Sequence, residues 1–574
     1  MTYLTRSVTA LACGLIVALG SQAFQPAAAG TLQSAKAIKT AAAPVAALAA
    51  VANPILEPQA AGTEKTYHVR TDGGSAAQCN GLANTAYPGS GTGLTCAWKG
   101  PMIALPPGGN PRIAGGDTLL VHAGSYMIGL GAPGAEACSS SWPWDCSMAP
   151  VPSGPAVDRP TRILGDGYDG VCKAGPQLWG TERTHHVLSL VGTSNAEVSC
   201  MEITDRSNCV LSHTGGLACK RTGYPYGQYA DSGIMASDSK NVTLSKLNIH
   251  GLAGNGILAG RLTDWTVNDV RLAANGWAGW NGDMASDGTG KGSSNAGTMR
   301  FSRWLVEYNG CGESYPEKKP VGCWGQSAGG YGDGVGTGDT GGNWIIEDSK
   351  FRFNTSDGLD LLYHKLGGTV TLNRVRAVSN AGNQIKVGGI ATVSNSVING
   401  NCGYFQGKSF TYNVDNCRAV GDALVFVALK STDVVAAVNN TLMSEGNVTI
   451  TASGPSGSVL KLRNNIMVGQ PYFLYPSYNS ADTYTEGAIR IDESYAIKQD
   501  LRNVKCTTPN SMCANAGLLQ AKGEQLNPRL TASSPARNTG LTHTADVLVP
   551  TTDFISNPRG VEGGYDRGAA EMQQ

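Results

Sequence analysis

Hydrophobic and polar residues alternate in short stretches along most of the chain, and glycine or asparagine ends each stretch after a few residues. Two clear examples are GIMASDSKNVTLSKLNIHG from Gly233 and GILAGRLTDWTVNDVRLAANG from Gly256, whose starts are 23 residues apart. Alternation with a period of two residues predicts β-strands and argues against amphipathic helices. The chain should therefore fold as many short strands joined by tight bends.

The spacing of these stretches is regular in the segment from Tyr331 to Gly389, where three segments can be laid over one another. They start at Asp333, Asp357 and Asn383, which are 24 and 26 residues apart. A β-sandwich would also give many short strands, but a near-constant period favours a solenoid. We therefore predict an all-β, right-handed parallel β-helix in which each strand pairs with the same strand of the next coil. Asparagines that recur at bends should stack in an internal ladder: Asn275, Asn354 and Asn380.

The repeat is interrupted at residues 277–331, a glycine-rich segment that carries four tryptophans and one strand-like piece, MRFSRWLVEYNG. We interpret it as long loops that project from one or two coils, and such insertions often lie on the binding face of a solenoid. Trp280 and Trp324 are candidates for stacking on the faces of sugar rings. The alternative, that some of these tryptophans are buried under the loops, stays open.

The two ends of the chain differ from this pattern. Residues 1–29 have a basic Arg6, an apolar stretch and Ala27-Ala28-Ala29, which predicts a signal peptide and export. Residues 30–64 are rich in alanine and are expected to be a linker or propeptide. We assign residues 65–530 to the β-helix and 531–574 to a C-terminal β-helix tail. The expected location is extracellular, with the periplasm as the alternative.

Cysteine content and charge agree with an exported protein. Without Cys13 in the apolar stretch, 14 cysteines remain, and most fall in pairs close in sequence, which predicts disulfides. There is no CxxC, and the histidines are not at ligand spacing, so zinc is not predicted. With 43 basic and 43 acidic residues the net charge is zero, which predicts neither a nucleic-acid nor a membrane partner. We expect a monomer.

Four titratable residues should converge on one outer surface. In the strand at 359–361, Leu359 and Leu361 point one way and Asp360 the other, and Lys386 occupies the equivalent outward position one coil later. Asp333 and Asp357 share the bend that precedes their strands. Three carboxylates at close quarters repel one another unless a cation joins them, and hard oxygen ligands suit calcium. Taken singly, each residue would pass for a turn or surface residue.

The stretches SDGLDLL and GNQIKVGG resemble the signature of polysaccharide lyase family 9, the pectate lyases on a pectin-lyase-like β-helix. The resemblance implies that Asp357 and Asp360 are calcium ligands and that Lys386 is the Brønsted base, with Asp333 as a further ligand. It implies a calcium-dependent carbon–oxygen lyase that acts on an acidic, pectate-like polysaccharide. The chain departs from the signature at Ser356, where the family tends to have another Asp, and at Leu362 and Gln384-Ile385.

The chemistry is consistent with this assignment. β-Elimination removes the C5 proton of a uronate, and a cation at the carboxylate would offset the charge that develops. Arg374 and Arg376 could bind a uronate carboxylate in bidentate fashion, and a lysine base predicts an alkaline pH preference. Two other classes stay open: a β-helix glycoside hydrolase that uses Asp357 and Asp360 as acid and base, and a non-catalytic glycan-binding or adhesive β-helix.

Overall fold

The structure is a computed structural model, and the chain divides into two units, Met1–Pro54 and Ile55–Gln574. The structure describes residues 64–573 except 140–144, 174, 212, 214, 221–226, 285–286, 326–329, 445–448, 469–483, 486–488, 492–516, 521–525 and 544–548. The predicted signal peptide and all but the last residue of the predicted linker lie outside the described residues. Within the described part of the chain, no helix has the length and apolar character needed to cross a membrane.

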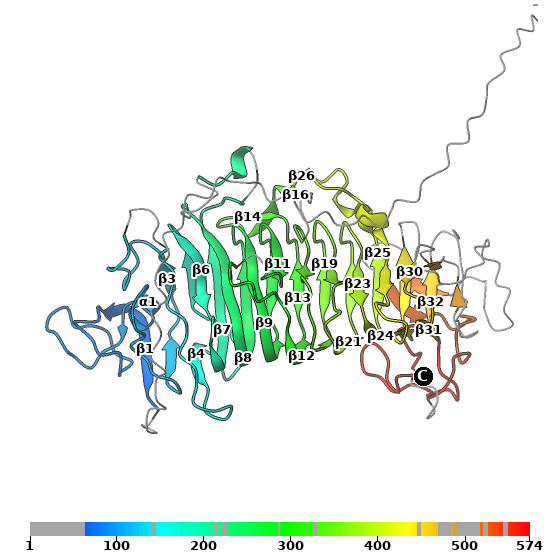
Figure 1. Ribbon diagram of the computed structural model, residues 1–574, viewed down its shortest axis with the longest axis horizontal. Helices are drawn as coiled ribbons and strands as arrows, with labels where there is room; N and C mark the ends of the chain where they lie inside the picture. Colours follow the sequence, from blue (N-terminus) through cyan, green and yellow to red (C-terminus); the bar gives the residue numbers. More distant parts are fainter. Residues whose placement is uncertain are drawn as a thin grey trace, which may run out of the picture. The chain divides into compact units, whose positions relative to one another are not determined.

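The second unit is a parallel β-helix, which confirms the predicted fold class. Parallel strands of successive coils pair side by side from β1 to β32 (Figure 1). Each regular coil contributes one strand to each of three faces, which we call the first, second and third face. The long strands β7, β8 and β9 continue round the corners and contribute to more than one face.

The candidate functional site lies on the first face. It contains the N-terminal parts of β8 (Ala230–His250) and β9 (Asn255–Asn268) together with β6 (Thr184–Ser189), β11 (Ala278–Asn281), β17 (Val335–Gly336), β20 (Leu359–Leu361), β23 (Ile385–Gly388), β27 (Leu424–Val427), β30 (Ile450–Ser453) and β34 (Ile489–Ile491).

The second face follows the first along each coil. It contains parts of β7 (Ser194–Asp205), β8 and β9 together with β1 (Thr66–Gly74), β2 (Thr118–Val121), β4 (Thr161–Gly165), β12 (Ala296–Ser302), β18 (Asn343–Glu347), β21 (Thr369–Asn373), β24 (Ile390–Ser394), β28 (Val434–Val438) and β31 (Val459–Arg463).

The third face completes each coil. It contains the C-terminal parts of β7 and β8 together with β3 (Ser125–Ile128), β5 (Gln177–Gly180), β10 (Arg271–Ala273), β13 (Leu305–Glu307), β19 (Lys350–Arg352), β22 (Arg376–Val378), β25 (Val397–Gly400), β29 (Thr441–Ser444), β32 (Ile466–Val468) and β33 (Tyr484–Thr485).

Short elements decorate the coils. Near the N-terminal end, all four residues of α1 are buried against the core. These elements are α1 (Pro101–Ala104), the 3₁₀ turns Gly215–Leu217, Cys402–Phe405 and Arg418–Gly421, the hairpin β14 (Gly312–Ser314) and β15 (Lys319–Val321), the parallel pair β16 (Cys323–Trp324) and β26 (Thr411–Asn413), and the antiparallel pair β35 (Leu518–Gln520) and β36 (Asn527–Leu530).

The period-two alternation fixes the inside and outside of each strand. Along the first face, Trp280, Val335, Leu359 and Ile385 are paired in register from coil to coil, and all four side chains are fully buried. Because successive side chains of a strand point to opposite sides, the residues next to these four in their own strands point out of the coil. The core is therefore a stack of like positions, and register places the outward residues of neighbouring coils side by side.

The predicted asparagine ladder is present and longer than expected. Each side-chain amide donates to the next: Asn275 to Asn309 at 3.0 Å, Asn309 to Asn354 at 2.9 Å, Asn354 to Asn380 at 2.7 Å, and Asn380 to Gln384 at 2.8 Å. All five residues are buried. Because each link satisfies a polar group that would otherwise be unpaired in the core, the ladder fixes the corner that leads into the first face.

The corner between the second and third faces is a tight turn built on left-handed residues. Asp348, Arg374, Asn395, Asn439 and Asn464 occupy it in successive coils, with φ between 48° and 56°. Asp and Asn adopt this conformation more readily than other non-glycine residues. Backbone geometry thus explains why four of these five residues are Asp or Asn; Arg374 is the exception.

The expected insertion at 277–331 contains one regular coil, made by β11, β12 and β13. The loops are therefore two, residues 282–295 between β11 and β12 and residues 308–334 between β13 and β17. The second loop carries β14, β15 and β16, and the Cys311–Cys323 disulfide closes it. Because it follows the third face and precedes β17, this loop projects at the corner that leads into the first face.

The described cysteines form six disulfides, in agreement with the predicted oxidised state. Cys506 and Cys513 lie outside the described residues. The six pairs are Cys79–Cys96, Cys138–Cys146, Cys172–Cys200, Cys209–Cys219, Cys311–Cys323 and Cys402–Cys417.

The C-terminal segment packs back onto the late coils. Arg559 is buried, pairs with Glu571 at 3.3 Å and donates to the side chain of Asn395 at 3.0 Å. The amide of Ala569 donates to the hydroxyl of Thr441 at 3.0 Å. The tail is thus anchored by hydrogen bonds to the coils around β24 and β29.

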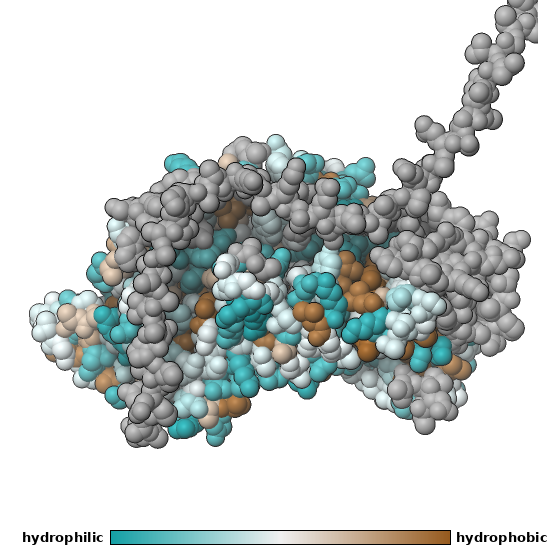
Figure 2. Space-filling model, viewed as in Figure 1, coloured by the Kyte–Doolittle hydropathy of each residue, from teal (hydrophilic) through white to brown (hydrophobic). Residues whose placement is uncertain are grey.

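On the face shown in Figure 2, polar and apolar described residues are mixed rather than gathered in one apolar band.

Candidate functional site

Asp360 and Lys386 lie next to each other on the outside of the first face. The register pairs Asp360 of β20 with Lys386 of β23, as the repeat overlay predicted. Leu359 and Leu361 flank Asp360 and are buried, so the strand holds the carboxylate outward. In the preceding coil, Gly336 of β17 is the register partner of Asp360 and has no side chain. This position therefore leaves space above the two charged residues.

Asp333 and Asp357 occupy one bend in successive coils and belong to a ladder of side chain to backbone hydrogen bonds. Asp333 Oδ1 accepts the amide of Asp357 at 3.0 Å, and Asp357 Oδ1 accepts the amide of Asn383 at 2.6 Å. Asn383 in turn accepts the amide of Asp422 at 3.0 Å. One oxygen of each carboxylate therefore has a structural role, and the other oxygen is available for chemistry.

The second oxygens are turned toward the charged pair on the strand. Lys386 Nζ donates to Asp360 Oδ2 at 3.0 Å and also to Asp357 Oδ2. A Cβ atom placed on Gly336 would lie 2.9 Å from Asp333 Oδ2, so this glycine gives the Asp333 carboxylate its room. The structure thus brings Asp333, Asp357, Asp360 and Lys386 together, all of them largely buried: the side chains of Lys386 and Asp360 are 14% and 17% exposed.

Burial and mutual repulsion dominate the electrostatics of the group. Burial, followed by the charges of Asp357 and Asp360, raises the pKa of Asp333 well above its usual range. Burial also raises the pKa of Asp360, against the opposing effect of Lys386. Burial lowers the pKa of Lys386, but the three carboxylates together outweigh it, and the net direction is upward. Burial and mutual repulsion thus oppose the charged forms of Asp333 and Asp360, and a further cation beside them would favour those forms.

The donor set fits a calcium ion. Three carboxylates from adjacent coils and a single cationic side chain leave a formal excess of two negative charges in a largely buried place. Carboxylate oxygens are the ligands that calcium prefers, and a divalent cation would offset this excess. Asp333, Asp357 and Asp360 are the residues that could hold it. Ser356 is buried and supplies a hydroxyl, not a fourth carboxylate, at the position before Asp357.

The two tryptophans singled out in the sequence have different surroundings. Trp280 is 0% exposed and packs edge-to-face against Trp265, Phe301 and Trp304 inside the coils, with ring centroids 5.6–6.2 Å apart. The expectation that Trp280 contacts substrate does not fit this position, because its ring lies in the core. The alternation of inward and outward residues could have predicted this burial, because Trp280 pairs in register with the inward Val335 of the next coil.

Trp324 lies at the surface of the second insertion loop. Its ring stacks on Tyr412 at 4.4 Å with an interplanar angle of 9°, and Tyr412 is 63% exposed. His213 contacts both Trp324 and Tyr331, and Tyr331 contacts Trp277 at 4.8 Å. Because Tyr331 is two residues before Asp333, these aromatic rings form a continuous series that starts beside the acidic bend.

Arg374 and Arg376 lie on other surfaces of the coil. Arg374 is at the corner between the second and third faces, where it binds Asp348 at 2.6 Å. Arg376 is on the third face and donates to the carbonyl of Leu526 at 2.9 Å. Both line a hollow of about 540 Å³ together with Phe554 and Ile555 of the C-terminal segment. The expected uronate clamp does not fit these positions, because Asp360 and Lys386 are on the first face.

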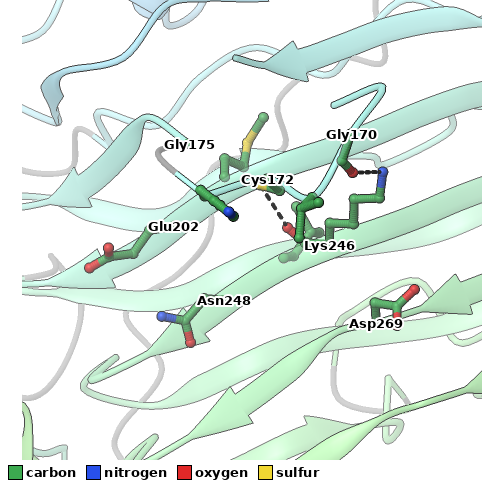
Figure 3. Close-up of a pocket in the computed structure, with 11 residues that line it drawn as sticks. Gly170, Cys172, Gly175, Glu202, Lys246, Asn248 and Asp269 are labelled. Carbon is green, nitrogen blue, oxygen red and sulfur yellow. Dashed lines mark hydrogen bonds between the residues drawn. The ribbon is translucent and has the colours of Figure 1, made fainter. Parts of the chain in front are cut away.

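A larger hollow, of about 820 Å³, lies over β7 and β8 and is lined by residues of a loop closed by the Cys172–Cys200 disulfide (Figure 3). Lys246 Nζ donates to the carbonyls of Tyr168 and Gly170, each at 2.7 Å. Its side chain therefore ties the loop to the coil. None of the four converging titratable residues lines this hollow.

Two residues near the site were not identified from the sequence. Asp422 occupies the bend one coil beyond Asn383 and is 2% exposed. The 39-residue gap between these positions hides the repeat that would have aligned them. Tyr363 lies close enough to Asp360 and Lys386 to feel their charges, and burial, then Asp360, raises the pKa of its phenol. The position of Tyr363 just after the strand that carries Asp360 could have indicated that it lies near the site.

Comparisons with known proteins find structural similarity without sequence similarity. The chain matches no protein-family model and no curated protein. Among solved structures it is similar to pectate lyase Pel9A (12% identity, 89% of this chain and 97% of that one, TM-score 0.40) and to a rhamnogalacturonan lyase (11%, 75% and 86%, 0.37). It is also similar to PfbA, a surface adhesin of Streptococcus pneumoniae (11%, 66% and 86%, 0.29). At TM-scores this low, the similarities carry no argument about function.

Proposed function

We propose that the protein is a secreted polysaccharide lyase that cleaves a uronate-containing, pectate-like polymer by β-elimination, with Lys386 as the base. The observation that carries the proposal is the convergence of Lys386, Asp333, Asp357 and Asp360 on one outward surface of the first face. Converging titratable groups in shifted environments are a mark of functional sites. The fit of the three carboxylates to calcium supports the same conclusion.

The reaction requires little beyond these residues. Lys386 Nζ takes the proton from C5 of the uronate, the electron pair forms the C4–C5 double bond, and the bond from C4 to the glycosidic oxygen breaks. The departing oxygen takes a proton from water. Calcium held by Asp333, Asp357 and Asp360 would supply positive charge beside the uronate carboxylate, which favours loss of the C5 proton.

The same carboxylates influence whether Lys386 is protonated. Lys386 donates hydrogen bonds to Asp357 and Asp360, and these bonds favour its protonated form. A base must be neutral before it can accept a proton. Calcium held by Asp333, Asp357 and Asp360 would take up these carboxylate oxygens, and Lys386 would then lose this stabilisation of its charge. The proposal therefore includes a calcium requirement for deprotonation of Lys386 as well as for substrate binding.

The Trp324–Tyr412 pair is the proposed sugar-binding surface. Tyr412 is exposed and Trp324 partly exposed, and stacked aromatic rings offer the flat contact that pyranose rings need. The loop that carries Trp324 projects at the corner that leads into the first face, and its aromatic contacts reach Tyr331. Trp280, Arg374 and Arg376 are left out of the proposed site because of their positions.

The test is ultraviolet absorbance during incubation with pectate, methylated pectin, alginate and glycosaminoglycans. We expect one uronate polymer to give an absorbing, unsaturated product, with the activity lost on chelation and restored by calcium. Lys386→Arg is the informative variant, because arginine keeps the ion pairs with Asp357 and Asp360 but cannot act as a base. It should lower kcat/KM by roughly 10²–10⁴-fold.

Lys365→Ala is the matched control, because Lys365 is an exposed lysine that pairs with Asp339 at 2.8 Å. It should leave kcat/KM within about twofold and the melting temperature unchanged, as expected for a surface ion pair. Full activity in a folded Lys386→Arg variant would remove the lysine from the mechanism. New reducing ends without absorbance would indicate a hydrolase, and the absence of any product would indicate a binding protein.

The hydrolase alternative rests on one observation. Burial raises the pKa of Asp360, as the acid of a glycosidase requires. Asp357 would then be the second carboxylate. The reducing-end measurement decides between the two reactions on the same samples.

A further inference from the structure

We propose that Asp145, His185 and His186 form a binding site for a divalent transition-metal ion of the zinc class, separate from the acidic site around Lys386. Ligand atoms of the three residues lie within 4.8 Å of one another. Two imidazoles and one carboxylate are the donor set of many zinc sites and differ from the all-oxygen set that calcium prefers.

The residues around this group orient it as a metal site requires. Asp145 Oδ1 accepts the hydroxyl of Ser147 at 2.6 Å, and the other oxygen, Oδ2, lies 3.7 Å from His185 Nδ1. On the opposite side of the same ring, His185 Nε2 lies 3.7 Å from Asp231 Oδ2. A carboxylate that faces the second nitrogen of a ligating histidine is the usual outer support of such a site.

His186 supplies the third donor atom. Its Nδ1 is buried and has no hydrogen-bond partner among the described residues. A buried imidazole nitrogen without a partner costs free energy unless a ligand occupies it. A metal ion shared with Asp145 and His185 would satisfy this nitrogen, which gives an observation independent of the clustering.

The local structure holds the three residues in place. His185 and His186 are adjacent in β6, and the hydroxyl of Ser147 accepts both of their amides, at 3.0 and 3.2 Å. The amide of Cys146 donates to the carbonyl of Arg183 at 2.8 Å, which ties the residue after Asp145 to the start of this strand. The group is therefore built from a loop and a strand that are fixed to each other.

The proposed site lies on the same face as Lys386 but several coils away. His186 pairs with Ser232, then Asn255 and Ala278 follow in register, and Asp333 is one coil further. Four coils at about 4.8 Å each place His186 roughly 19 Å from Asp333. The two sites should therefore bind their metals independently. Because a chelator removes both metals, each metal has to be added back separately.

The test is a titration of the full chelator-treated protein with Zn²⁺ against a chromogenic competitor, followed by Co²⁺ titration read in the visible spectrum. We expect one tight equivalent of Zn²⁺, unaffected by millimolar Ca²⁺ or by Lys386→Arg. His186→Ala and Asp145→Asn should each weaken Zn²⁺ binding by at least about 100-fold. Asp231→Asn should weaken it by about 10–100-fold, as expected for an outer support.

His122→Ala is the matched control, because His122 also faces a carboxylate, Asp166, at 3.0 Å but belongs to another group. It should leave Zn²⁺ affinity unchanged. Far-ultraviolet circular dichroism confirms folding, and Asp145→Asn preserves side-chain shape if His186→Ala does not fold. Absence of tight Zn²⁺ binding, or binding retained in both folded His186→Ala and Asp145→Asn, would overturn the proposal, as would loss of binding in His122→Ala alone.

Discussion

At the scale of single residues, the side of the strand decides what a side chain can do. Asp360 and Lys386 are outward and meet through register, whereas Trp280 is inward and packs in the core. Trp324 lies on a loop, outside the strand alternation of the coils, and is partly exposed between the buried His213 and the exposed Tyr412. Residue type alone does not separate these two tryptophans.

This difference gives a paired prediction for the tryptophans. Trp280→Ala should lower the free energy of unfolding by about 3–5 kcal/mol, because it leaves a cavity among aromatic rings. Trp324→Ala should cost less than about 1 kcal/mol but weaken oligouronate binding and raise KM. Urea denaturation and steady-state kinetics measure the two effects. If Trp324→Ala destabilises the fold as much as Trp280→Ala and leaves KM unchanged, the Trp324–Tyr412 pair is structural.

At the scale of elements, hydrogen-bonded ladders fix the corners that carry the site. The asparagine ladder runs beneath the bend that holds Asp333 and Asp357, and both end on the corner before the first face. The acidic bend uses the same device, since Asp333 accepts the amide of Asp357. The carboxylates are therefore held by backbone contacts in addition to their charge.

The ladder can be tested at its centre. Asn354→Ala removes four buried hydrogen bonds, because this side chain accepts the backbone and side-chain amides of Asn309 and donates to the side chain of Asn380 and the carbonyl of Val306. We expect the free energy of unfolding to fall by at least about 2 kcal/mol, because each buried polar group left without a partner costs about 1–3 kcal/mol. Asn343→Ala, at an exposed strand position, should cost less than about 1 kcal/mol. Equal losses in the two variants, measured by urea denaturation, would contradict a special role for the ladder.

At the scale of the whole molecule, an ion network joins the insertion to the coils. His250 on the third face is 1% exposed and lies 2.5 Å from Glu313 of the hairpin and 3.0 Å from Glu202 of the preceding coil. Lys318 of the same hairpin binds Glu202 at 2.7 Å. The hairpin is thus connected to two coils through the buried Glu313–His250 pair and the partly exposed Lys318–Glu202 pair.

This network predicts how stability changes with pH. Burial lowers the pKa of His250, but Glu202 and Glu313 outweigh it and raise the pKa above its usual value. The folded state then binds this proton more tightly, so the contribution is complete below about pH 6.5 and is lost as pH rises through the folded-state pKa. Burial raises the pKa of Glu202, but hydrogen bonds from His250 and Lys318 outweigh it and lower it to about 2.

Glu202 therefore stabilises the fold above about pH 4.5, and its contribution is lost as pH falls toward its folded-state pKa. Urea denaturation between pH 2 and 9 measures the loss of stability on both the acid and the alkaline side. His250→Gln should flatten the loss of stability on the alkaline side. An unchanged alkaline slope in His250→Gln would show that another group is responsible.

The sequence by itself determined the coil, the inside and outside of β20 and β23, and the pairing of Asp360 with Lys386. The physical reason is that a parallel β-helix repeats one local rule, so the period and the alternation of a strand fix where its residues lie in the next coil. The asparagine ladder followed from the same periodicity, and only Asn309 and Gln384, whose spacing departs from it, were missed.

Only the tertiary structure decided the surroundings of residues outside the regular repeat. Arg374 sits at a left-handed corner where Asp348 of the preceding coil binds it, and Trp280 belongs to a coil that glycine-rich loops hid. Asp145, His185 and His186 meet because hydrogen bonds of Cys146 and Ser147 hold Asp145 beside β6, which no spacing of histidines along the chain encodes. Contacts between a loop and a distant coil depend on where the loop folds back, and a repeat rule carries no information about that.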